Sequence, residues 1–277
     1  LNADSSINAT AGTSTIEGRM NLRGDSGLNV DMTVANGATL EVTAAITSSG
    51  GDTGFTKLGT GTLALSGSNT FSGNVTVGAG TLAISHANAL GSGGSTTVNS
   101  GGTLALSNNI TVATETGGLS LNGTGYNGGG ALQNTSGNNL WDGNITLAGH
   151  ATIQSLAGQL KLGDESSFTD TISLGSNTLT FDTSGGNLWV NAIISGTGSV
   201  VKSGSGTLTY YMDENTYTGT TTVKDGTLLL DQRRHPRQHR RRRQHRRRPV
   251  RHLPALHRRL PTHCRLGQPH RLLRRPV

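Results

Sequence analysis

Short runs in which aliphatic residues alternate with threonine, serine or alanine constrain this chain more than any other feature. They recur from Leu63/Leu65 to Leu228/Leu230, and clusters of glycine, serine and asparagine separate them. A period of two is typical of a strand with one buried face. The intervening clusters supply turns. Helical periodicity extends over no more than the single turn of residues 86–90, so we expect an all-β fold.

One longer phrase occurs twice. Residues 57–82 read KLGTGTLALSGSNTFSGNVTVGAGTL, and residues 202–228 read KSGSGTLTYYMDENTYTGTTTVKDGTL. In each copy a lysine precedes Gly-x-Gly-Thr-Leu, an Asn-Thr-aromatic triplet follows, and a second Gly-Thr-Leu closes the phrase. Repetition of short strands at long range predicts a solenoid.

A parallel β-helix accounts for this composition. Its coils stack at ~4.8 Å, so a thin aliphatic column can fill the inside while threonine, serine and asparagine cover the outside. At about 20–25 residues per coil, residues 1–231 would form about ten coils. Proline would remove a donor from the ladder, and all six prolines lie beyond residue 231.

The two phrases resemble the autotransporter-associated β-strand repeat, also called the passenger-associated transport repeat. The resemblance implies a right-handed parallel β-helix in the surface-exposed passenger of a bacterial type V secretion autotransporter. We therefore expect residues 1–231 to be a β-helical passenger fragment with repeats at 54–91 and 198–231. An outer-membrane translocator barrel is expected in the full-length protein, and the location is expected to be the cell surface or the extracellular space.

Charge divides the chain at residue 231. Residues 1–231 carry all 16 acidic and six basic residues, a net charge of −10, whereas residues 232–277 carry 17 arginines and no acid. Such a tail is typical of a disordered segment or of a nucleic-acid or anionic-surface binder. The only cysteine, Cys264, lies in this tail, so no disulfide or thiolate metal site is expected in residues 1–231.

A shifted reading frame explains the tail better. Forty of its 46 residues are Arg, His, Pro, Leu or Gln, the five amino acids with codons that begin with cytosine. Moving the frame by one base returns codons for Gly, Ala, Asn and Thr, which is the composition of the upstream repeats. We therefore expect residues 232–277 to be a disordered frameshift product, and no nucleic-acid partner unless the tail is genuine.

The leading functional hypothesis is a structural or adhesive passenger with no chemistry and no cofactor of its own. Its partners would be a host-cell or extracellular-matrix surface, or the same protein on another cell. The alternative is a β-helical polysaccharide lyase or hydrolase. The acids are thinly spread, however, and the adjacent pairs Asp164-Glu165 and Asp213-Glu214 would point to opposite faces of a strand.

Few residues suggest a binding site. Arg23, Gly24 and Asp25 spell a tripeptide by which some surface proteins bind integrins, although a chance occurrence is common in Gly-rich chains. His86 and His150 lack a second ligand at metal spacing. Residues 196–206 lack the Gly-Lys-Ser/Thr ending of a phosphate loop.

The residues shared by the two phrases are expected to be structural. Lys57 and Lys202 are interpreted as coil-edge charges that discourage edge pairing. Asn69 and Asn215 are interpreted as bonding the backbone of their own turns. The aromatic residues Trp141, Trp189 and Phe181 are expected to pack inside or cap a coil, with a sugar-binding platform on the outer face as the alternative.

Overall fold

The computed structural model describes residues 1–2, 5–24, 29–49, 51–113, 115–165, 169–211 and 214–231. All of them belong to the first of the chain's two units, residues 1–236, the second being residues 237–277. The predicted tail of residues 232–277, with its disorder and its shifted frame, lies outside the described residues.

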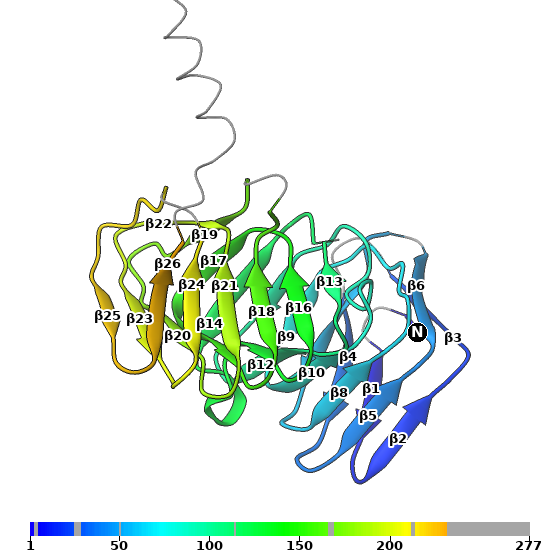
Figure 1. Ribbon diagram of the computed structural model, residues 1–277. Coiled ribbons are helices and arrows are strands. Elements are labelled where there is room, and N and C mark those ends of the chain that lie inside the picture. Colours follow the sequence, from blue (N-terminus) through cyan, green and yellow to red (C-terminus); the bar gives the residue numbers. More distant parts are fainter. Residues whose placement is uncertain are drawn as a thin grey trace, which may run out of the picture. The chain divides into compact units, whose positions relative to one another are not determined.

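The described chain is a parallel β-solenoid of about nine turns. Every strand pair is parallel and joins one coil to the next, and Figure 1 shows the strands stacked in sequence order from blue to orange. The expected all-β parallel β-helix is thus confirmed. The one helix among the described residues is the 3₁₀ turn η1 (Tyr126–Gly128). No described helix has the length and apolar character needed to cross a membrane.

The strands lie on three faces, and most coils contribute one strand to each, although residues 66–74 and 85–95 pass the third face without a strand. The first face consists of β1 (Ser6–Ala9), β4 (Asn29–Val34), β7 (Gly54–Leu58), β9 (Val75–Val77), β11 (Thr96–Val98), β14 (Leu119–Gly123), β19 (Thr171–Ser173) and β22 (Ile193–Ser195). The long strand β17 (Ile145–Ser155) pairs with β14 and β19 at its start and with strands of the second face at its end.

The second and third faces follow in each coil. The second consists of β2 (Thr13–Ile16), β5 (Thr39–Val42), β8 (Thr62–Leu65), β10 (Gly80–Ile84), β12 (Gly102–Leu106), β15 (Leu132–Asn134), β20 (Leu179–Asp182), β23 (Val200–Ser203) and β25 (Thr221–Val223). The third consists of β3 (Arg19–Arg23), β6 (Ala45–Ser49), β13 (Thr111–Val112), β16 (Asn138–Trp141), β18 (Gln159–Leu162), β21 (Asn187–Val190), β24 (Thr207–Tyr210) and β26 (Thr227–Leu230).

The core is a set of columns that run along the stack. Inward residues are stacked on inward residues of the next coil, as the alternation predicts, and the fully buried column of the second face is almost wholly aliphatic. Its successive members are Leu40, Leu63, Leu82, Leu104, Leu132, Ile153 and Phe181, and the column continues to the buried Lys202. Phe181 and Trp141 are both fully buried, which confirms their expected place inside the coils.

The two copies of the repeated phrase occupy different faces. The first copy forms β7 and β9 of the first face with β8 and β10 of the second. The second copy forms β23 and β25 of the second face with β24 and β26 of the third. The phrase therefore builds the same pair of neighbouring strands wherever it falls around the coil.

Candidate functional site

Lys57 lies inside the stack, in β7, with its side chain fully buried. Its Nζ donates hydrogen bonds to three backbone carbonyl oxygens, those of Leu58 at 3.0 Å, Gly59 at 2.7 Å and Ala79 at 3.0 Å. The interpretation of this lysine as a coil-edge charge is wrong. The carbonyl oxygens at this corner of the coil accept the hydrogen bonds that the ammonium group would make to water if it were exposed.

Lys202 repeats this arrangement in β23. It is also fully buried, and its Nζ donates to the carbonyl oxygens of Ser203 at 2.8 Å, Gly204 at 2.6 Å and Asp225 at 2.9 Å. The interpretation as an edge charge is wrong here for the same reason. We call each set of three carbonyl oxygens a lysine cradle.

Burial sets the titration of both lysines. It lowers the pKa of Lys57 to about 8. It also lowers the pKa of Lys202, where the carboxylates of Asp225 and Asp182 oppose the effect. At neutral pH most of the Lys57 population is still an ammonium ion, whose three N–H groups match the three carbonyl acceptors.

The repeated asparagines bind neighbouring coils. The Oδ1 of Asn69 accepts a hydrogen bond from the backbone N–H of Ile46 at 2.8 Å, and its Nδ2 donates to the carbonyl of Ala89 at 2.6 Å. Asn215 likewise accepts from the N–H of Ile194 at 2.8 Å. Their expected structural role holds, but the expected bond to their own turns is wrong, because the free backbone groups lie one coil away.

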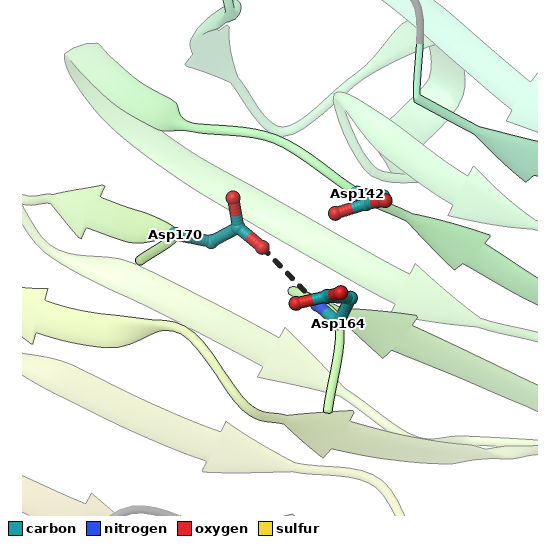
Figure 2. Close-up of side chains that lie close together, drawn as sticks. All are labelled: Asp142, Asp164 and Asp170. Carbon is teal, nitrogen blue, oxygen red and sulfur yellow. Dashed lines mark hydrogen bonds between the residues drawn. The ribbon is translucent and has the colours of Figure 1, made fainter. Parts of the chain in front are cut away.

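Three aspartates from two neighbouring coils converge at one corner (Figure 2). Asp142 follows β16, Asp164 follows β18 and Asp170 precedes β19, and one carboxylate oxygen from each lies within 4.8 Å of the others. The backbone N–H of Asp164 donates to Oδ2 of Asp170 at 3.1 Å. Burial raises the pKa of Asp142, and repulsion from Asp170 and Asp164 raises it further.

Chemically, the aspartate cluster offers three of the six to eight oxygen ligands that Ca²⁺ takes. Sequence reasoning missed it because it treated the acids as thinly spread. The available signal was that all three aspartates flank strands, but the coil lengths needed to align them are not visible in the sequence. Glu165, the neighbour of Asp164, instead forms an ion pair with Lys161 at 2.9 Å.

A buried glutamate was also missed. Glu115 is only 6 % exposed, and its Oε2 accepts a hydrogen bond from the Thr96 hydroxyl at 2.7 Å. Its Oε1 is buried with no hydrogen-bond partner. Burial raises the pKa of Glu115 to about 7, although the bond from Thr96 opposes this.

The residues that the sequence singled out as possible binding sites, the Arg23-Gly24-Asp25 tripeptide and the two histidines, belong neither to the lysine cradles nor to the aspartate cluster. Arg23 ends β3 with an exposed side chain, Gly24 follows it, and Asp25 lies outside the described residues, as does Asp213. The Nδ1 atoms of His86 and His150 accept hydrogen bonds from backbone N–H groups at 3.0 and 2.9 Å. His86 therefore stabilises its own turn, and His150, within β17, joins its coil to the next.

Trp189 is the one predicted aromatic residue on the outer side of a strand, where it is half-buried. The Nζ of Lys161 lies 4.9 Å from the centre of its ring. The ring of Tyr211 packs against it at 5.1 Å between centroids. Both contacts involve the ring that a sugar platform would use.

The fold and these contacts define a parallel β-solenoid in which two buried lysines join successive coils at the copies of one phrase. The family model of the Passenger-associated-transport-repeat matches residues 55–84 and 200–230. The two matches contain the two lysine cradles and confirm the resemblance drawn from the quoted phrases. The repeats and the solenoid are consistent with an autotransporter passenger domain. Comparison with curated proteins gave no match, and neither did comparison with solved structures.

Proposed function

We propose that this chain is a surface-exposed passenger region of a bacterial autotransporter, with a structural or adhesive role and no chemistry of its own. The observation that carries the proposal is the presence of two transport repeats within one continuous stack of parallel coils. A stack of this kind can fold coil by coil, because each coil contacts only its neighbours.

The surface of the solenoid supports a role in display. Two hollows among the described residues, of about 330 and 250 Å³, are lined by glycine, serine, threonine, asparagine and leucine. Neither is lined by a carboxylate, an imidazole or a cationic side chain, whereas enzyme sites usually combine a concave pocket with titratable groups.

Surface display is the direct test. The chain would be placed between a secretion signal and an outer-membrane translocator barrel, and intact cells would be probed with antibody and protease. We expect the chain to be accessible on the surface. A matched fusion that carries Gly54→Pro in β7 should show less protease-resistant material, because a Cβ atom at this position would lie 1.8 Å from the carbonyl oxygen of Asn74 in the next coil. Retention of the parent chain inside the cell would contradict the proposal.

Adhesion requires its own experiment. Beads coated with the chain would be tested for binding to host cells, to extracellular-matrix proteins and to one another. The tripeptide Arg23-Gly24-Asp25 is tested by the conservative change Asp25→Glu, which keeps the charge and alters its reach. Equal binding by the two proteins would exclude the tripeptide and leave the rest of the surface as the adhesive part.

The aspartate cluster favours a second candidate function, that of a β-helical polysaccharide lyase or hydrolase. A carboxyl group whose pKa is raised, as that of Asp142 is, suits a general acid. A screen of acidic and neutral polysaccharides would detect turnover. Turnover that Asp142→Asn abolishes would replace the passenger-only role with an enzymatic one.

A further inference from the structure

The lysine cradles are built twice from the same elements of sequence. In each, the lysine Nζ binds the carbonyl of the next residue, the carbonyl of the glycine after it, and a carbonyl of the following coil. The third carbonyl belongs to the residue before the second Gly-Thr-Leu, Ala79 in one copy and Asp225 in the other. Since the copies lie on different faces, the phrase and not the face determines the arrangement.

Glycines make room for the cation. Gly59 and Gly204 have φ angles of 72° and 75°, and Gly80 and Gly226 both have a φ of 68°, a region that favours glycine. A Cβ atom on Gly226 would lie 2.8 Å from Nζ of Lys202. One on Gly80 would lie 2.6 Å from the carbonyl oxygen of Gly59, which is a member of the other cradle.

An apolar residue would otherwise be expected at the lysine positions. Lys57 lies between Met32 and Val77 in its column, and Lys202 lies between Phe181 and Val223. Burying a charge in an aliphatic column is costly unless its hydrogen bonds are satisfied. The carbonyl oxygens must therefore offset that cost.

We propose that each transport repeat encodes a carbonyl site for an ammonium ion, which its own lysine fills and which joins one coil to the next. The site would take a small cation with three N–H donors. Two of these donors bond to carbonyl oxygens of the coil that carries the lysine, and the third bonds to a carbonyl oxygen of the following coil. This role goes beyond the proposed function and does not depend on it, because it concerns the stack and not its display.

Chemical rescue distinguishes a bound cation from a merely packed side chain. Lys57→Ala removes three methylene groups and the ammonium group, and these atoms together correspond to n-propylammonium. Hydrogen–deuterium exchange would be followed in the full chain, at the amides of residues 75–84. We expect exchange there to speed up about tenfold or more, because hydrogen bonds to a charged group are lost. Millimolar to molar n-propylammonium should restore the slower exchange in a dose-dependent way.

Three probes serve as controls at matched concentration and ionic strength. They are n-propanol, which lacks the charge, tetramethylammonium, which lacks N–H donors, and sodium chloride. Rescue by propanol equal to that by propylammonium would overturn the proposal in favour of stem packing. Lys57→Met keeps an apolar stem without the ammonium, so parent-like exchange in that variant would also overturn it. Lys161→Ala, on the outer face, should leave the exchange of residues 75–84 unchanged.

A variant of the second cradle keeps the proposal testable if Lys57→Ala does not fold. Lys202→Ala affects the junction with residues 214–231, the last described coil, while residues 51–113 of the same protein serve as an internal reference. We expect faster exchange at residues 221–230 only, and rescue by the same cation. Unchanged exchange at residues 221–230 would contradict the proposal.

Discussion

Replacing Glu115 by glutamine should make the free energy of unfolding of this protein less dependent on pH, because it removes the contribution of one titrating carboxyl group. The side chain is buried beside Thr96 with one oxygen unpartnered, and its pKa is raised from 4.5 to about 7. Because the folded state binds a proton more tightly than the unfolded state, this group does not penalise folding below pH 4.5. As the pH rises from 4.5 to about 7, ionisation of this carboxyl group lowers the free energy of unfolding, and above about pH 7 the loss does not increase further.

The size of the effect follows from the two pKa values. A difference of about 2.5 units at about 1.36 kcal/mol per unit gives roughly 3 kcal/mol of stability lost between pH 4.5 and pH 8. Glutamine keeps an acceptor for the Thr96 hydroxyl but cannot ionise. Its NH₂ group introduces an unpaired donor that costs about 1–3 kcal/mol, but this cost is the same at every pH and leaves the slope unaffected.

Urea unfolding measured at intervals from pH 4.5 to 8 would test this expectation. Tryptophan fluorescence is a suitable signal, since one of the two tryptophans, the buried Trp141, lies in the following coil. The Glu115→Gln profile should be flatter than the parent profile by about 3 kcal/mol over the range. Glu165→Gln, at an exposed ion pair, is the matched control and should keep the parent slope. Parallel profiles for Glu115→Gln and the parent would refute the reasoning.

Three further changes test other parts of the stack. Asn69→Ala should lower the free energy of unfolding by about 2–4 kcal/mol, since it leaves groups of two neighbouring coils unpaired, whereas Asn74→Ala, at an exposed ladder position, should cost under about 1 kcal/mol in the same denaturation assay. Gly54→Ala should cost more than about 3 kcal/mol in thermal unfolding, because a Cβ there would lie 1.8 Å from the carbonyl oxygen of Asn74; a cost below 1 kcal/mol would contradict the close approach. Asp142→Asn should raise stability above neutral pH and have no effect in acid, because burial and the repulsion from Asp170 raise the pKa of Asp142; a pH titration of the melting temperature checks this, and equal gains at all pH values would exclude it.

Alternation allowed most of the fold to be predicted. Period two identified the inward leucines such as Leu63 and Leu82, and these residues are stacked one above the other. The phrase shared by residues 57–82 and 202–228 identified the repeats. The inner place of Trp141 and Phe181 was also predictable, because large apolar side chains in a Gly- and Ser-rich chain have few other places to be buried.

The contacts between coils could not be predicted. A lysine in an alternating strand is equally compatible with an edge, and its three carbonyl partners come from turn geometry and from the next coil. Coil length varies as well. Lys57 pairs with Val77, 20 residues later, whereas Leu104 pairs with Leu132, 28 residues later. Without these lengths the convergence of Asp142 and Asp170 cannot be inferred from the sequence.

Neighbouring coils pair residue for residue and carry similar sequences, and this affects how the gene can change in length. Residues 80–84 read GTLAI and pair one to one with residues 102–106, which read GTLAL. An in-frame loss of residues 80–101 would join Ala79 to Gly102 and place Leu104 against Leu63, leucine against leucine as before. It would also keep the Ala79 carbonyl that binds Lys57. Unequal recombination can therefore shorten or lengthen such a gene by whole coils. The length of the solenoid can then change between generations, while apolar side chains still stack on one another at each junction.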